Sequence, residues 1–154
     1  MTLQLRPSTT ADSPAVRAMI TAVLIEYGLP PAPDSTDSDL FDLQASYHAR
    51  GGRFDVLCDP QGQVLGSVGL LPVGERSVEL RKMYLAPQAR GQGHGRRLLE
   101  HALQWARAQG YARMELETAS VLVEAVGLYR AYGFRPYKPA QMTCRCDQAH
   151  ELQL

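Results

Sequence analysis

Residues 79–97 read ELRKMYLAPQARGQGHGRR, so a strand, a glycine-rich turn and the basic start of a helix follow one another directly. Gly91, Gly93 and Gly95 can adopt positive φ and bring bare N–H groups against a ligand. The helix that follows adds its unpaired amides and the positive end of its dipole. This order of elements predicts a binding site for a pyrophosphate or a similar anion.

Two better-known glycine loops do not match. The chain lacks the Gly-x-x-x-x-Gly-Lys-Ser/Thr of a P-loop. A dinucleotide fold has Gly-x-Gly-x-x-Gly after the first strand of a βαβ unit, whereas the spacing here is Gly-x-Gly-x-Gly in mid-chain. The hexapeptide RGQGHG at 90–95 instead resembles the Gln/Arg-x-x-Gly-x-Gly/Ala signature of the GCN5-related N-acetyltransferases (GNAT).

Flanking segments extend this resemblance over nearly the whole chain. MYLAP at 83–87 resembles the bulged fourth strand of the family and its terminating proline. AVGLYRAYGF at 125–134 resembles the family's Ala-x-x-Leu-Tyr-x-x-x-Gly-Phe element, and LRP at 5–7 with Asp12 resembles its start. The glycine loop, MYLAP and AVGLYRAYGF occur in the family's order, and these three linked elements identify the chain as a member of this family.

Local patterns predict the individual elements. Strands are expected at 3–6, 53–58, 64–71, 77–85 and 111–118, with closing strands from 134 and 142. Helices are expected at 13–27, at 40–49 and at 122–132, and another where apolar residues repeat at helical spacing from Leu98 until Gly110 stops it. The sum is an α+β fold with a mixed, mostly antiparallel sheet of six to seven strands and about four helices on both faces. The resemblance implies that strands four and five splay apart.

Bulk properties limit the function. We expect one domain over 1–154. Sixteen basic and sixteen acidic residues give no net charge, so nucleic acid is not an expected partner. No signal core or long apolar stretch is found, which predicts a cytoplasmic protein without a membrane partner. Cys58, Cys144 and Cys146 have no zinc spacing, so we expect no metal and free thiols, most simply in strands. The acidic stretch 34–39 is either a solvated loop or a lid.

The resemblance implies acetyl transfer from acetyl-CoA, as cosubstrate, to a primary amine. The cosubstrate would lie in the splay, where backbone groups of Met83 and Leu85 would hold the pantetheine and the Met83 N–H would polarise the thioester carbonyl. Leu122 replaces an asparagine that many members use for a side-chain contact. The expected cosubstrate-binding residues are Met83, Tyr84, Leu85, Arg90, Gly91, Gln92, Gly93, His94, Gly95 and Arg96.

Two residues are candidates for proton transfer. Only a neutral amine attacks the thioester, so a base is needed, and Glu79 lies where several family members carry a catalytic glutamate. Period-two alternation places Glu79 on one face with Arg81, Met83 and Leu85. An ion pair without proton transfer is the alternative for Glu79, and Glu115 and Glu117 are rival bases. Tyr129 matches the family's acid tyrosine, although it also fits an apolar helix stripe.

The acceptor is the least determined part of the sequence. Candidate substrate-binding residues are Tyr27, Tyr47, His48 and Arg81. Arg81 would suit a carboxylate, which favours an amino-acid-like small molecule. A protein or peptide N-acetyltransferase and a non-catalytic acetyl-CoA-sensing module are alternatives. We also expect a homodimer, because the family often pairs through sheet edges or C-terminal strands.

Overall fold

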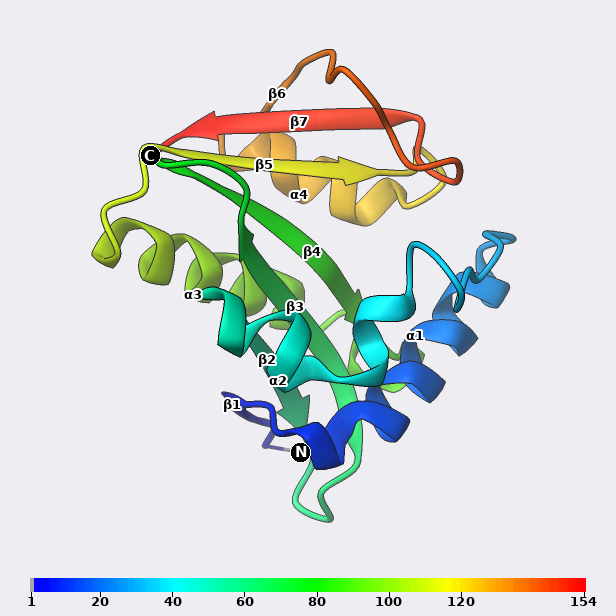
Figure 1. Ribbon diagram of the computed structural model, residues 1–154. Helices are drawn as coiled ribbons and strands as arrows, with labels where there is room; N and C mark the ends of the chain where they lie inside the picture. Colours follow the sequence, from blue (N-terminus) through cyan, green and yellow to red (C-terminus); the bar gives the residue numbers. More distant parts are fainter. Residues whose placement is uncertain (1) are drawn as a thin grey trace.

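The computed structural model describes residues 2–154, in which a seven-stranded sheet packs between α-helices (Figure 1). The strands are β1 Gln4–Pro7, β2 Arg53–Cys58, β3 Val64–Pro72, β4 Ser77–Leu85, β5 Arg113–Thr118, β6 Arg135–Pro136 and β7 Gln148–Gln153. The α-helices are α1 Ser13–Glu26, α2 Leu43–Ser46, α3 His94–Ala108 and α4 Val123–Ala131. Short 3-10 helices lie at Thr10–Asp12, Ser38–Phe41, His48–Arg50 and Pro87–Ala89.

The strand order in the sheet is β1-β2-β3-β4-β5-β7-β6, and only the β4–β5 pair is parallel. Helices α1 and α2 pack on one face and α3 and α4 on the other (Figure 1). Each long helix buries one stripe, such as Leu98, Leu99, Ala102, Leu103 and Ala106 of α3. The predicted α+β fold, with a mixed, mostly antiparallel sheet and helices on both faces, is confirmed.

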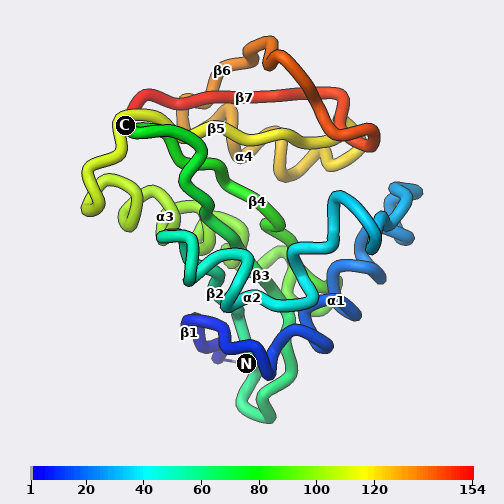
Figure 2. The backbone as a smooth tube through the Cα atoms, in the orientation of Figure 1, coloured from blue at the N-terminus to red at the C-terminus, as the bar shows by residue number. Residues whose placement is uncertain are grey.

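Strands β4 and β5 separate after a short parallel contact, as predicted. Their paired residues run only from Ser77↔Arg113 to Glu79↔Glu115, and beyond these the strands diverge (Figure 1). Two loops approach the open side: the segment before α2, and the loop between β6 and β7 (Figure 2). Arg145 of the second loop bonds to Asp37 of the first, so these two capping loops meet on the open side of the divergence.

The predicted helix at 40–49 is wrong in detail. Asp42 is extended, with φ −146°, and its carboxylate accepts the Ala45 N–H at 3.0 Å as the N-cap of α2. The segment is therefore a 3-10 turn, the short helix α2 and a second 3-10 turn, which ends at Gly51 with φ +80°.

The predicted strand from residue 142 is also wrong, because β7 begins only at Gln148. Before it, the Cys146 N–H donates to the Thr143 carbonyl in a turn, and the Thr143 N–H donates to the Glu117 side chain. Cys58 lies buried in β2 as expected, but Cys144 and Cys146 belong to this turn and not to a strand. No helix within residues 2–154 is long and apolar enough to cross a membrane.

Candidate active site

Two adjoining pockets line the divergence of β4 and β5. Both are bordered by the same four residues, Met83, Tyr84, Leu122 and Ala125. One pocket continues to the glycine loop before α3, and the other continues to carboxylates of β4 and β5 and to the two capping loops. A molecule lying across the shared residues would reach both ends.

The glycine-loop end offers a set of free backbone amides. The Arg97 N–H donates to the Gly93 carbonyl at 3.1 Å, whereas the amides of 91–96 have no acceptor within residues 2–154. Gly91 and Gly93 have φ of +74° and +84°, and a Cβ on either would meet no atom within 4 Å. Gly95 has ordinary helical geometry, which corrects the expectation of positive φ there. The loop therefore presents N–H groups and a helix N-terminus to open space.

Most of the predicted cosubstrate residues line this end. They are Met83, Tyr84, Leu85, Arg90, Gly91, Gly93, His94 and Gly95. Gln92 does not line either of the two pockets; its side chain is exposed and donates to the Gln88 carbonyl at 3.1 Å. Arg96 lies on α3 beside Tyr132, with its guanidinium carbon 5.8 Å from the ring centroid. Neither side chain reaches the pocket, so only their backbone amides can contribute.

Arg90 is held in place by the chain itself. Its guanidinium donates to both Glu26 oxygens at 2.7 and 2.9 Å and to the Leu85 carbonyl at 3.0 and 3.1 Å. It also lies over the Tyr27 ring, at 5.3 Å from the centroid. The Leu85 carbonyl is therefore engaged by Arg90, which weakens the expectation that it binds pantetheine.

A β-bulge in β4 changes which side chains share a face. Ser67 pairs with Tyr84 and Gly69 with Arg81, so Lys82 and Met83 together face one residue of β3. Lys82 has φ +54°, and the extra residue inverts the alternation beyond it. Met83 packs on the α3 side and Tyr84 on the α1 side. The expected common face of Glu79, Arg81, Met83 and Leu85 is thus wrong beyond Arg81.

The bulge brings Lys82 into a cluster of ion pairs beside the second pocket, away from the glycine loop. Its ammonium contacts Asp39 at 3.1 Å, Asp37 at 3.4 Å and the Thr36 carbonyl at 2.9 Å. Arg145 forms two hydrogen bonds to Asp37, both 2.6 Å long. The Lys82, Asp37 and Arg145 side chains are only 4%, 9% and 6% exposed. This cluster joins both capping loops to β4, so Asp37 and Asp39 are anchored while Asp34, Ser35 and Ser38 of the same stretch are exposed.

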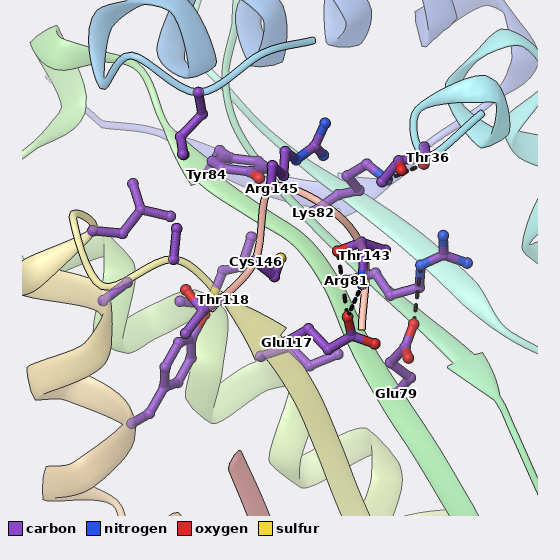
Figure 3. A pocket seen from close by; sticks show the side chains of 17 residues that line it. Thr36, Glu79, Arg81, Lys82, Tyr84, Glu117, Thr118, Thr143, Arg145 and Cys146 are labelled. Atoms are coloured by element: carbon purple, nitrogen blue, oxygen red, sulfur yellow. Dashed lines mark hydrogen bonds and ion pairs between the residues drawn. The ribbon is translucent and has the colours of Figure 1, made fainter. Parts of the chain in front are cut away.

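Glu79 and Arg81 extend this cluster, in which carboxylates and cations alternate (Figure 3). Arg81 lies 3.1 Å from Glu79 and 3.7 Å from Asp39. Burial raises the pKa of Glu79, and the charge of Arg81 opposes this only in part. Glu79 therefore combines an ion-pair contact with the raised pKa that suits a base.

Tyr129 lines the same pocket from α4. Its ring packs against Phe134 at 5.7 Å between centroids, and its hydroxyl has no hydrogen-bond partner in the described part of the chain. Burial raises its pKa, so it stays protonated at neutral pH. The residue is at once part of the apolar stripe and a free donor.

The predicted acceptor residues lie in different places. Arg81 lines the pocket that contains the carboxylates, which we call the acceptor end, while Tyr27 lines the glycine-loop end. Tyr47 is fully buried behind Arg81 and donates its hydroxyl to Asp39. His48 contacts the Ser8 hydroxyl at 3.2 Å and lines neither pocket. Tyr47 thus supports the wall of the pocket, and His48 is not brought to it.

Sequence reasoning missed several residues of the acceptor end. Lys82 and Arg145 were not among the candidates, and Cys146 was expected in a strand. Asp37 and Asp39 were treated only as members of an acidic stretch. One available signal was the acidic composition of 34–39, which calls for cationic partners when the segment is buried.

The comparisons with known proteins agree with this fold. Residues 18–134 match the model of the "Acetyltransferase (GNAT) family". The uncharacterized N-acetyltransferase YjgM of Escherichia coli K12 is 37% identical over 135 residues, which are 84% of this chain and 80% of that protein. A GNAT-family acetyltransferase of Staphylococcus aureus Mu50 has a TM-score of 0.93 at 18% identity, over 99% of both chains.

A third comparison is a GNAT-superfamily phosphinothricin acetyltransferase of Sinorhizobium meliloti, solved in complex with AcCoA. It has a TM-score of 0.76 at 22% identity, and the match covers 100% of this chain and 89% of that one. The fold, the family model and the curated relative all agree. The chain belongs to the GNAT family and is an acyl-CoA-dependent N-acetyltransferase.

Proposed function

We propose that the chain transfers the acetyl group of acetyl-CoA directly to a primary amine of a small molecule. The observation that carries this proposal is the pair of adjoining pockets along the β4–β5 divergence, which share Met83, Tyr84, Leu122 and Ala125. Free amides at one end suit a pyrophosphate, and carboxylates at the other end suit a protonated amine. Acetyl-CoA supplies the acetyl thioester between them.

The chain's residues fit the proposed cosubstrate. In the proposal, the amides of 91–96 hold the pyrophosphate, and Met83 and Tyr84 border the pantetheine and acetyl positions. The open space at Gly91 and Gly93 supports this placement, since any side chain there would fill the pocket. Leu122 offers only apolar contact in this position, in place of the amide group that many relatives have.

The proton-handling roles are assigned to Glu79 and Tyr129, which line the same pocket. Glu79 accepts the proton of the acceptor ammonium, directly or through water, because its raised pKa brings its basicity closer to neutral pH. Tyr129 donates a hydrogen bond to the departing thiolate. A thiolate of pKa ~8.5 is a weaker base than a tyrosinate, so the hydroxyl stabilises the leaving group chiefly as a donor.

A small acceptor is favoured over a protein by the capping loops. Arg145 and Asp37 join the two loops through a buried ion pair, which supports a closed cup and not an open groove. A cytoplasmic location and a homodimer remain proposals from the sequence. Sheet pairing would use the part of the outer edge of β7 that is left open, because β6 pairs with Glu151 and His150 and the Tyr137 N–H donates to the Ala149 carbonyl.

The test is incubation with acetyl-CoA and a panel of primary amines, with free thiol release and N-acetylated product as readouts. Amine-dependent thiol release with a matching acetylated product is expected. The competing function is an acetyl-CoA-sensing module without turnover. Binding of acetyl-CoA without thiol release on any amine would favour that module and refute the proposal.

A further inference from the structure

Glu117 differs from the other glutamates around the sheet. It lies on β5 beyond the last residue paired with β4, and its side chain lines the acceptor pocket opposite β4. Its Oε1 accepts the Thr143 N–H at 2.7 Å and the Thr143 hydroxyl at 3.3 Å. Within residues 2–154, no Lys, Arg or His nitrogen lies within ion-pair distance of it, whereas Glu79 contacts Arg81 and Glu115 contacts Arg113.

The cations around the pocket already have acidic partners. Arg81 lies beside Glu79 and Asp39. The other two belong to the buried cluster, where Lys82 contacts both aspartates and Arg145 contacts Asp37. Three cations therefore face four carboxylates, counting Glu117. The surplus negative charge of the pocket resides on Glu117.

A half-buried carboxylate without a cation is a ready site for one. Removing it from water weakens its solvation, and two hydrogen bonds to a single oxygen leave the other oxygen available. Charge-assisted N–H···O bonds to a carboxylate are about twice as strong as neutral ones. Glu79 and Glu117 also point toward the same part of the pocket (Figure 3), so a cation there would relieve their mutual repulsion.

We propose that Glu117 binds the ammonium group of the acceptor, and that the acceptor carries no carboxylate. This inference rests on the proposed function and narrows its substrate class to aliphatic or arylalkyl amines and diamines. Glu117 holds the cation while Glu79 receives the proton, so the two carboxylates have separate tasks. Thr143 keeps Glu117 oriented through its backbone and hydroxyl.

A carboxylate on the acceptor would meet unfavourable contacts in this pocket. To reach Arg81 it would have to displace Glu79 or Asp39, which already lie 3.1 and 3.7 Å from the guanidinium. It would also lie in a pocket with surplus negative charge. This reverses the expectation that Arg81 selects an amino-acid-like acceptor.

The test compares amines that differ only in a carboxylate: cadaverine with lysine, and tyramine with tyrosine. The carboxylate-free member of each pair should have the higher kcat/KM. Glu117→Gln should raise KM for the cationic amine roughly 10- to 100-fold, with KM for acetyl-CoA unchanged. Glu117→Asp, which keeps the charge, should recover part of the loss. Glu151→Gln is the matched control, because Glu151 pairs with Arg113 and does not line the pocket.

The glutamine side chain can still accept the Thr143 N–H, so the variant should fold, which circular dichroism and a melting curve check. Preference for lysine and tyrosine, or an unchanged KM in Glu117→Gln, would overturn the inference. Calorimetric titration of cadaverine into the CoA-loaded protein gives a readout without turnover. Binding that depends on Glu117 would support the inference even if no amine released thiol, and only the proposed function would then fail. Absence of cadaverine and tyramine binding would overturn the inference itself.

Discussion

Replacing Glu79 by glutamine tests its role in proton transfer without changing the shape of the active site. The change keeps the shape of the side chain and removes its charge, so the contact with Arg81 loses its ionic component while Arg81 retains Asp39. Glutamine cannot accept a proton at neutral pH. If Glu79 is the base, the variant should bind acetyl-CoA normally and turn over slowly.

The size of the loss follows from the protonation of the acceptor. An aliphatic ammonium has a reference pKa of ~10.4, so near pH 7.4 only about one molecule in a thousand is neutral. A positioned base removes this limitation and contributes about 10²–10⁴-fold. We therefore expect kcat at neutral pH to fall about 10²–10⁴-fold. The remaining rate should rise about tenfold per pH unit toward the pKa of the amine, because only the neutral fraction reacts.

The folding stability of Glu79→Gln should not fall, in contrast to its kcat. Burial raises the pKa of Glu79 above its ordinary value of 4.5, so the folded chain binds this proton more tightly than the unfolded chain. Ionised Glu79 therefore destabilises the fold, and stability falls as pH rises through the raised pKa. Glu79→Gln removes this penalty, so the melting temperature at neutral pH should stay the same or rise.

The assay is the pH–rate profile of thiol release, run with wild type, Glu79→Gln and the control Glu151→Gln. Wild type should show an acidic limb that levels off above the pKa of Glu79, and the control should keep that limb. A fully active Glu79→Gln enzyme, with the wild-type profile, would refute the reasoning and leave the amine to lose its proton directly to water.

The remaining predictions concern the leaving group, the ion cluster and assembly. Tyr129→Phe should lower kcat with little change in melting temperature, because the hydroxyl has no partner in the described chain; full turnover from pH 6 to 9 would return the residue to the apolar stripe. Asp37→Asn should cost about 3–5 kcal/mol in urea unfolding, since it leaves Arg145 buried without its carboxylate; the exposed-pair variant Glu26→Gln should change stability far less. Burial would raise the pKa of Asp37, but its hydrogen bonds and cationic partners hold it below 3.8, so this contribution should be present above about pH 4 and fade in more acidic solution. Light scattering at micromolar concentration should give a dimeric mass, and a monomeric mass would exclude the homodimer.

Local patterns were sufficient for the regular elements. The strands at 53–58 and 77–85 were predicted with their observed bounds, because a hairpin turn and apolar alternation mark them clearly. The glycine loop could also be recognised from the sequence. Gly91 and Gly93 adopt positive φ, which residues with a side chain rarely do, so glycines at these positions mark the turn. These features depend on neighbours in the sequence.

The acceptor end depends on contacts that no local pattern contains. Arg145 and Asp37 are 108 residues apart, and their pairing is decided by where two loops meet. The resemblance implied a bulged β4, but the bulge falls at Lys82 and reverses the alternation that placed Met83 and Leu85 beside Glu79; the spacing of β4 alone does not mark the extra residue. Family resemblance located the channel, and only the fold revealed the charges that line it.

Calorimetric titration with acetyl-CoA tests the central claim most directly, namely that the amides of 91–96 hold the pyrophosphate. Gly93→Val places a β-branched side chain at φ +84° and in the pocket, whereas Gly95→Ala adds a methyl group at ordinary contact distances of 3.6 and 3.8 Å from Leu128 and Leu85. The account predicts that wild type and Gly95→Ala bind acetyl-CoA, and that folded Gly93→Val does not. Unchanged affinity in Gly93→Val would contradict it.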